Sequence, residues 1–393
     1  MATERIFTRD FMLDMFLTLF CSLNYFALLI NIVDFSDDVF HASSAESGFA
    51  VGIYVIGGLL ARLFIGKYVE LVGRKRMLII GVVFAVLMSA AYFAVSSIEV
   101  LYVVRFLHGM SYGITSTCTG DIVSKLLPPS RRGEGLGYYG LAFTASSAVG
   151  PLLGMKMGAT GNWDLVFGVG VLLYVLALVC AVFIHVPEED LTEEQVKQAR
   201  SFDLNNLLQV SALPLAVTAM VFYFSYSGVL SFMSSYSAEI GLTEAATYFF
   251  VIFSVATLIS RLTTGRIYDS RGANIVMIPA FVSVFGGMVV FSQTSNPYGF
   301  LGSAFFMGYG VSIVFSICQA IVVAESPAHR YGVTTSTFSA MNDLGTGLGP
   351  TFLGAVLPLL GFRSMYLMCA FISLISLVLY WSIHGHRELK GSS

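Results

Sequence analysis

Charged residues are scarce in this chain. Only 11% of its 393 residues are Asp, Glu, Lys or Arg, against 56% hydrophobic residues and a mean hydropathy of +0.79. A soluble protein of this length would need far more polar surface to face water. The composition therefore excludes a soluble globular protein and indicates a chain that lies largely in lipid.

Cysteine is also rare, and the five cysteines show no paired spacing. Each lies inside an apolar stretch, so we interpret them as small buried residues and neither as disulfides nor as metal ligands. The sequence has no nucleotide-binding loop, no metal-ligand cluster and no nucleophile paired with a base. An enzyme is thus the least favoured class, and we expect no cofactor, no metal and no nucleic-acid partner. The cysteines are Cys21, Cys118, Cys180, Cys318 and Cys369.

Long apolar stretches recur along the whole chain, each about 20 residues long, enough to cross a hydrocarbon core about 30 Å thick. A bilayer offers no partners for free backbone polar groups, so each stretch should be a helix. The sequence predicts an all-α polytopic protein in the lipid bilayer. The twelve stretches are 11–33, 47–66, 77–95, 99–121, 135–157, 164–186, 211–233, 246–265, 275–293, 298–322, 333–357 and 365–384.

Basic residues predict the orientation. They gather in alternate loops and in both tails, whereas the opposite loops hold only Lys156 and Arg363. Both termini should therefore be cytoplasmic. The first apolar stretch is longer than a signal-peptide core and has no small-residue cleavage site, so no cleavable signal is evident.

One spacing relates the two halves of the chain. A separation of 199 residues pairs Arg62 with Arg261, and the same offset recurs over roughly 90 residues, which indicates a duplication. We expect an N-terminal six-helix bundle over 1–186, a cytoplasmic linker over 187–208 and a C-terminal six-helix bundle over 209–393. Within the linker, Thr192 and Gln195 suit a capping box for a short surface helix. Other pairs at this offset are Gly109 with Gly308, Pro128 with Pro327, Arg131 with Arg330, Gly133 with Gly332, Gly150 with Gly349 and Pro151 with Pro350.

The most specific motif is GKYVELVGRKR, from Gly66 to Arg76, with a second copy, GRIYDSRG, from Gly265 to Gly272. We expect a tight turn between helices that only small residues allow at Gly66 and Gly73. The motif resembles the signature loop of major facilitator superfamily transporters, and the chain resembles their bacterial drug:proton antiporter branch. The resemblance implies two pseudo-symmetric six-helix bundles, a small-molecule site near the midplane, a monomer, and the plasma (cell inner) membrane.

The resemblance also implies a cytoplasmic gate, in which the acid and arginine of the signature loop join a carboxylate at the end of span 4. A charge network of this kind holds the cytoplasmic side shut. In the second half, Ala273 and Ala320 replace two of its members, so that latch should be weaker or should depend on Arg271 and Glu325. The expected gate residues are Gly66, Glu70, Gly73, Arg74, Asp121, Gly265, Asp269 and Gly272.

Span 4 contains RFLHGMSYG, in which Arg105 and His108 lie one turn apart. An intramembrane arginine is costly and usually faces a bundle interior or a wet cavity; in the family this arginine is linked to proton coupling or substrate contact. The alternative is that Arg105 pairs purely for packing. Spans 1, 4, 7 and 10 line the family's cavity. The expected cavity residues are Asn24, Asn31, Arg105, His108, Tyr112, Tyr223, Tyr226, Tyr309, Ser312, Ser316 and Gln319.

Span 5 resembles the motif of family members that exchange substrate for protons. Its small residues allow close helix contact, and its proline frees a carbonyl and bends the helix, which suits a hinge. A role in helix packing alone is nearly as well supported. The expected hinge residues are Gly150, Pro151, Gly154, Gly349 and Pro350.

The preferred proton carrier is Asp343, ten residues into span 11. At about 1.5 Å per residue it lies roughly 15 Å deep, where a charged aspartate costs about 2.5–3.5 kcal/mol. It should be protonated, paired or hydrated, and the alternative is a carboxylate locked to a neighbouring polar group. The rival carriers are Asp34, Glu325 and, for coupling, Arg105.

The leading hypothesis is a secondary active transporter that exports a small organic compound in exchange for protons. One alternative is a proton-coupled importer or a facilitative carrier of the same fold, which the direction of flux under a pH gradient would distinguish. Another is a transport-inactive membrane receptor or scaffold, which would show no substrate-dependent proton movement. The sequence does not name the cargo.

Overall fold

The structure of the chain is a computed structural model that describes residues 5–128, 132–186, 208–326 and 331–386. The predicted linker, 187–208, and its expected surface helix lie almost wholly outside the described residues. At some helical positions only the backbone is described; these are 63, 66–71, 124, 132–134, 136–137, 262, 265–266, 269–270 and 331–332.

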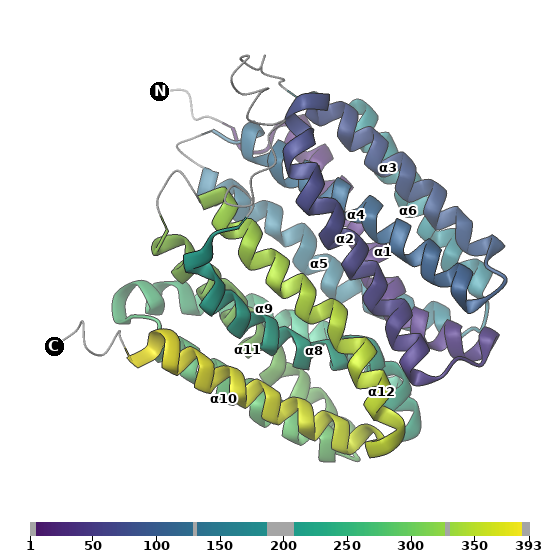
Figure 1. Cartoon of the computed structure of the whole chain (residues 1–393), viewed down its shortest axis with the longest axis vertical. Coiled ribbons are helices and arrows are strands. Elements are labelled where there is room, and N and C mark those ends of the chain that lie inside the picture. The colour runs from purple at the N-terminus through teal and green to yellow at the C-terminus, as the bar shows by residue number, and fades with distance from the viewer. Residues whose placement is uncertain (1–4, 129–131, 187–207, 327–330, 387–393) are drawn as a thin grey trace. The chain divides into compact units, whose positions relative to one another are not determined.

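The described residues form helices at every one of the predicted apolar stretches, and no strand is assigned among them, which confirms the all-α fold. The helices of the first half are α1 (Arg9–Phe40), α2 (Ser44–Val72), α3 (Arg74–Ala91), α4 (Ile98–Leu126), α5 (Arg132–Gly158) and α6 (Trp163–Phe183) (Figure 1). Those of the second half are α8 (Leu213–Glu239), α9 (Thr243–Arg271), α10 (Asn274–Gln293), α11 (Pro297–Ala324) and α12 (Tyr331–Tyr380). Short turns of other helix types are η1 (Tyr92–Ala94), η4 (Val210–Ala212) and η6 (Trp381–Gly385).

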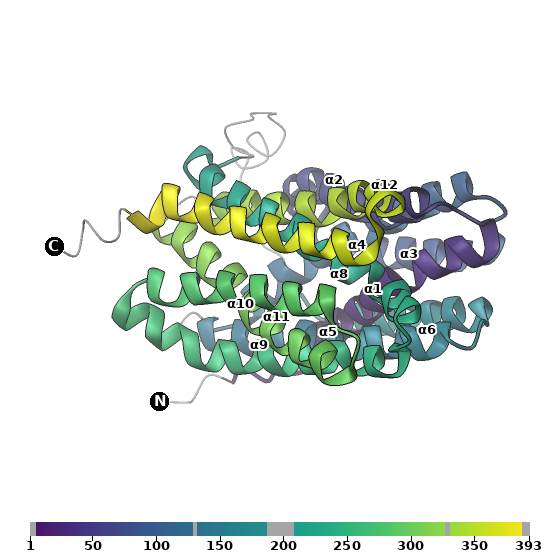
Figure 2. The same cartoon turned by 90° about the horizontal axis from the view of Figure 1, so that it is seen from below.

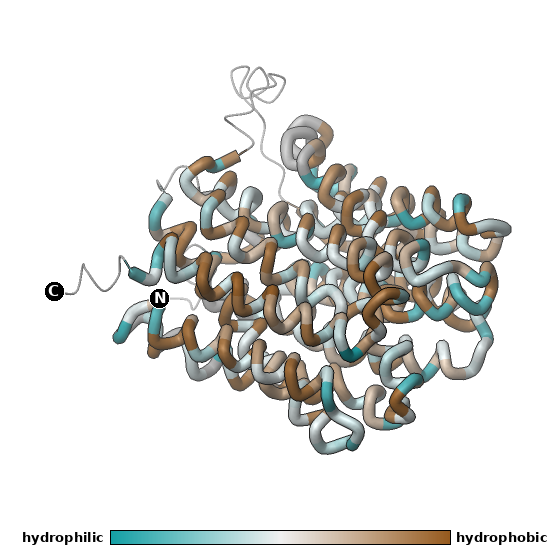
Figure 3. The backbone as a smooth tube through the Cα atoms, turned by 60° about the horizontal axis from the view of Figure 1, so that its bottom comes forward, coloured by the Kyte–Doolittle hydropathy of each residue, from teal (hydrophilic) through white to brown (hydrophobic). Residues whose placement is uncertain are grey.

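Helix α12 contains the last two predicted stretches. Two helical segments are joined at Gly361, where a φ of 71° interrupts the helical geometry and produces a kink. Among the described residues, nine helical stretches are long and apolar enough to cross a membrane. Helices α4 and α5, rich in polar residues and glycine, are not among these nine. Figure 3 shows hydrophobic residues running along the helices, with hydrophilic residues gathered at several loops.

The chain divides into two compact units. The first comprises Met1–Asn31 and Ile53–Phe202, and the second comprises Ile32–Gly52 and Asp203–Ser393. The end of α1 and the start of α2 therefore group with the second half of the chain. The prediction of one bundle over 1–186 and a second over 209–393 stays a prediction.

The 199-residue repeat is visible in the local geometry. Ser97 caps α4 by accepting a hydrogen bond from the backbone N–H of Val100. Asn296 caps α11 in the same way, accepting from the N–H of Gly299. Both caps satisfy a backbone donor that the first helical turn leaves free. The duplicated sequence thus starts two helices by the same chemistry.

Close helix contacts repeat as well. A Cβ atom at Gly109 would overlap the carbonyl oxygen of Tyr54, and one at Gly308 would overlap that of Phe253. Each partner is 199 residues from its counterpart, so α4 meets α2 as α11 meets α9. Small residues at such crossings let two backbones approach, which supplies the packing contacts that hold helices together in lipid.

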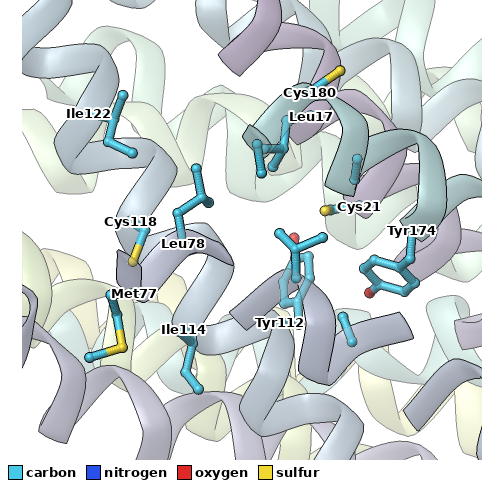
Figure 4. Packing of buried hydrophobic residues seen from close by; sticks show 14 of the residues in the cluster. Leu17, Cys21, Met77, Leu78, Tyr112, Ile114, Cys118, Ile122, Tyr174 and Cys180 are labelled. Carbon is cyan, nitrogen blue, oxygen red and sulfur yellow. The ribbon is translucent and has the colours of Figure 1, made fainter. Parts of the chain in front are cut away.

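Within the first unit, α3 packs against α4 and α6, and in the second unit α11 packs against α9 and α10 (Figures 1 and 2). Helix α12 packs against α8 and α10. The core of the first unit is a cluster of buried side chains from α1, α2, α3, α4 and α6, part of which is drawn in Figure 4. It includes Leu17, Cys21, Leu78, Cys118 and Tyr174.

Candidate functional site

The signature loop turns at its second glycine. Gly73 has φ 94° and Gly272 has φ 85°, a region that favours glycine because it has no Cβ atom. Gly66 and Gly265 lie inside α2 and α9. The expectation of a turn at Gly66 was wrong, because the helix continues to Val72 and only the residue after it has to reverse the chain.

The expected gate has one pair in place. The Arg74 Nε–H donates to the Asp121 carboxylate, which joins the start of α3 to the end of α4. Arg74 is 6% exposed, so the pair is partly withdrawn from water. The side chains of Glu70 and Asp269 lie outside the described part of the chain.

The second half of the chain has a different side-chain pair at the end of α11, the helix that corresponds to α4. Ala273 is buried at the start of α10. The Oε1 atom of Glu325 lies 3.0 Å from the Nδ1 atom of His384, within hydrogen-bond distance. This pair joins the end of α11 to η6, and no ion pair between Glu325 and Arg271 is found among the described residues.

Arg105 lies in a buried group that we call the Arg105 cluster, formed by Tyr54, Tyr92, Arg105, His108 and Tyr174. Arg105 is 1% exposed, and its guanidinium carbon lies 4.3 Å from the ring centre of Tyr54. Cation–π contact of this kind is strong where water is excluded. The guanidinium also donates to the Tyr92 hydroxyl at 3.3 Å.

His108 extends the cluster. Its Nδ1 lies 3.1 Å from the Tyr92 hydroxyl, and its ring meets Tyr54 and Tyr174 edge-on. Its Nε2 has no hydrogen-bond partner among the described residues, whereas the hydroxyls of Tyr54 and Tyr174 interact with each other. Most buried polar atoms in proteins are satisfied, so the imidazole Nε2 is the unmet atom of the cluster.

Four of the five matching positions of the second unit are apolar. At an offset of 199, Tyr54, Tyr92, Arg105 and His108 correspond to Phe253, Phe291, Ala304 and Met307. All four of these are buried. The fifth member, Tyr174, corresponds to Ser373, which is polar and also buried. The fold therefore forms without the cluster's tyrosines, imidazole and guanidinium.

The other expected cavity residues of the first unit are buried against helices. Gly158 lies against the Asn31 side chain, and Gly170 lies against that of Asn24. Asn24 also borders a cavity of about 10 Å³ between α1, α5 and α6, close to the space that one water needs. Tyr112 stacks on Tyr25 with 5.1 Å between ring centres.

In the second unit, Tyr226 is buried and stacks on Phe253 with 5.4 Å between ring centres. Ser312 is also buried, and its hydroxyl has no partner among the described residues. The remaining expected residues are half-buried: Tyr223, Tyr309, Ser316 and Gln319. These side chains lie on α8 and α11, as the spacing predicted.

The expected hinge glycines pack closely. Gly150 and Gly154 lie against α1 at Phe26 and Ala27, and Gly349 lies against α8 at Ser227. Pro151 and Pro350 lie inside α5 and α12. The glycines thus have a demonstrated packing role, while a hinge function stays a prediction.

The expected proton carriers differ in their surroundings. Asp34, at the end of α1, accepts hydrogen bonds from Ser234 at 2.8 Å and Ser235 at 3.2 Å, both on α8. Asp343 is half-buried on α12, and both amide atoms of the neighbouring Asn342 are buried without a hydrogen-bond partner among the described residues.

Sequence reasoning missed one buried acid, Asp14. It lies on the same face of α1 as Leu17 and Cys21, at three- and four-residue steps, and that spacing could have revealed it. The remaining missed members of the site are the tyrosines of the Arg105 cluster, which come from separate stretches of sequence.

Ionisable side chains buried inside the helices of a polytopic membrane protein are typical of membrane transporters. Comparison with known families agrees: the sequence model of the Major Facilitator Superfamily matches residues 15–298 and 275–392. The chain belongs to the major facilitator superfamily. It is a carrier of small molecules and not an enzyme.

Its relatives include named exporters. The chain is 22% identical over 360 residues to the staphylopine export protein of Staphylococcus aureus, covering 86% of this chain and 87% of that protein. It is 22% identical over 363 residues to multidrug resistance protein 2 of Bacillus subtilis, covering 89% of each.

Solved structures share the fold. A nucleoside transporter, NupG, matches with a TM-score of 0.76 at 13% identity, covering 96% of this chain and 99% of that one. A transporter of the POT family bound to a peptide conjugate matches with a TM-score of 0.78 at 12% identity, covering 96% and 97%.

Proposed function

We propose that this protein exports a small organic compound in exchange for protons, by alternating access. The observation that carries the proposal is the Arg105 cluster. It places a guanidinium, an imidazole and three tyrosine rings in the interior of one unit. At the offset of 199 residues, four of these five side chains correspond to apolar ones, and Tyr174 corresponds to Ser373. Intramembrane ionisable groups of this kind mark substrate and proton paths.

The direction of transport is proposed from the relatives. Two similar proteins are named for export or multidrug resistance, and span 5 resembles the motif of exchangers. In this proposal Arg105 binds an acidic or strongly hydrogen-bonding group of the cargo, since charge-assisted hydrogen bonds are about twice as strong as neutral ones. His108 and Tyr112 lie on the same helix as Arg105 and are buried with it.

The proposed roles of the gate residues and of the proton carrier rest on where these residues lie in the helices. Arg74 and Asp121, with Glu70, hold the cytoplasmic ends of α2, α3 and α4 together. Asp343 carries the proton within the second unit. Both termini lie in the cytoplasm, and the protein works as a monomer in the cell membrane.

Proton-linked flux is the direct test. The purified protein is reconstituted into liposomes that contain a pH-sensitive dye, and a panel of cationic dyes, nucleosides and dipeptides is screened first by thermal stabilisation, because a bound compound stabilises the folded state. We expect a stabilising compound to be accumulated in liposomes with an acidic interior, with alkalinisation of that interior. Accumulation with the opposite gradient would show an importer, and uptake without proton movement would show a facilitative carrier.

A further inference from the structure

Asp14 is a buried acid that the proposed site does not use. It lies one and a half turns inside α1 and is 0% exposed. Neither of its carboxylate oxygens has a hydrogen-bond partner among the described residues. An ionised carboxylate in such a place is strongly disfavoured. A neutral acid, by contrast, needs only an acceptor for one O–H.

Among the described residues, no positively charged group is found to interact with Asp14. The titratable groups near enough to interact with it are the thiols of Cys21 on α1 and Cys118 on α4 and the phenol of Tyr139 on α5, with Cys180 of α6 beside Cys21. Figure 4 labels Cys21, Cys118 and Cys180 in this core. No group of three or more residues able to hold a metal ion is found among the described residues. A proton is the cation that suits this environment.

Hydroxyl groups of α1, α4 and α5 lie in the neighbourhood of Asp14. Thr18, one turn further along α1, is 2.7 Å from the Tyr139 hydroxyl. Tyr139 also shares a side-chain hydrogen bond with Thr119 of α4. One turn before Thr119, the Ser116 hydroxyl accepts from Arg62 on α2 at 3.3 Å.

The duplicated half shows that the fold does not need this acid. Gly150 faces the carbonyl of Leu23 and Gly349 faces that of Phe224, so α1 and α8 are related by an offset of 201 residues. Asp14 then corresponds to Leu215, which is 4% exposed.

The two hydroxyl-bearing residues, Thr18 and Tyr139, also have apolar counterparts in the second unit. Thr18 corresponds to Ala219 at the offset of 201, and Tyr139 corresponds to Phe338 at the offset of 199. Both counterparts are buried. The second unit thus has leucine, alanine and phenylalanine at the three matching positions. The packing of the fold therefore does not require the oxygen atoms that the first unit has there.

We propose that Asp14 is a proton-binding site of the first unit, which takes up and releases a proton through Thr18 and Tyr139 during the transport cycle. Because it adds a second site to Asp343, this inference rests on the proposed exchange for protons. Uptake converts the carboxylate and one proton to a neutral carboxylic acid, and release reverses this step without any other reactant.

Infrared spectroscopy of the protein in liposomes tests the site without any substrate. We expect the wild-type protein at neutral pH to show a C=O stretch of a protonated carboxylic acid that is lost at high pH. This band should be weaker by the contribution of one carboxylic acid in Asp14→Asn and undiminished in the matched control Asp164→Asn, whose carboxylate is exposed. An unchanged band in Asp14→Asn would overturn the proposal.

A second variant separates a transport role from a structural one. Asp14→Leu installs the side chain of the second unit, and removing an unpaired buried polar group in favour of an apolar one is neutral or stabilising. We expect its thermal stability to be equal or higher, with at least tenfold loss of pH-driven accumulation and intact exchange of bound compound. Full pH-driven transport by Asp14→Leu would refute the inference. Absence of pH-driven transport in the wild-type protein would instead refute the proposed function, while the infrared result would still decide the proton site.

Discussion

At the scale of single residues, the first unit concentrates its polar chemistry around Arg105. The guanidinium lies over Tyr54 and donates to Tyr92, and Tyr92 also meets His108. Removal of one partner from a buried hydrogen bond leaves a costly unmet polar group. The cluster should therefore respond sharply to small changes.

The first prediction concerns Arg105 itself. Arg105→Ala should weaken binding of an identified cargo by about 10- to 100-fold, the loss expected for a charged hydrogen bond of about 1.5–3 kcal/mol. Binding isotherms of the purified protein provide the measurement. Arg105→Lys, which keeps the charge but not the planar fork, should recover part of the loss. Wild-type affinity in Arg105→Ala would show that the residue is structural.

A second residue-scale prediction concerns Asp343. Asp343→Asn should abolish accumulation driven by a pH gradient and spare exchange of substrate for substrate, because the amide keeps the shape but binds no proton. Asp38→Asn, an exposed acid at the end of α1, is the matched control. Proteoliposome flux measures both. Undiminished gradient-driven transport in Asp343→Asn would move the proton to Asp34, Glu325 or Asp14.

At the scale of elements, close helix crossings decide which sequences can form the bundle. Gly109 and Gly308 face backbone carbonyls at equivalent crossings of the two units. A methyl group there must push two helices apart, since backbone atoms cannot move independently of their helix. By contrast, Gly168 of α6 has open space around its missing side chain.

This contrast predicts opposite effects of the same substitution. Gly109→Ala should destabilise the protein by about 1–3 kcal/mol, as overpacking does. Gly168→Ala should be neutral or stabilising by about 0.5–1 kcal/mol, because alanine favours the helix. Unfolding midpoints in detergent measure both variants. Equal stability of the two variants would mean that the crossing at Gly109 is loose.

At the scale of the whole molecule, the contacts of α1 and α2 change along their length. Residues 32–52 group with the second unit, whereas the rest of both helices groups with the first. Asp34 meets α8, and Gly48 and Gly52 lie against α12 at Pro350 and Gly347. One end of these helices is therefore part of a different packing unit from the other end.

The gate makes a prediction at the same scale. Asp121→Asn should slow transport by about tenfold or more and leave equilibrium binding within a few-fold, because loss of one charge-assisted contact with Arg74 changes the population of closed states. Asp164→Asn is the exposed control. Flux and binding assays on the same preparation supply the two numbers. A large loss of affinity with a normal cycling rate would place Asp121 in the substrate site.

The amino-acid sequence by itself determined the class, the helices and the repeat of this protein. Apolar stretches of the right length can satisfy their backbone in lipid only as helices, and the motifs around Gly73 and Gly272 identified the family. The one local error, a turn at Gly66, arose because a small residue permits a turn without requiring one.

Tertiary structure alone decided which polar residues meet. Tyr54, Tyr92 and Tyr174 come from three separate elements, so no spacing along the chain could place them around Arg105 and His108. It also decided that Asn24 and Asn31 are buried against neighbouring helices. Residues 32–52 belong to the second packing unit, although they precede most of the first unit in the sequence. Periodicity reports which face of a helix is polar, but burial of an acid such as Asp14 depends on the helices packed against that face, and these contacts exist only in the folded chain.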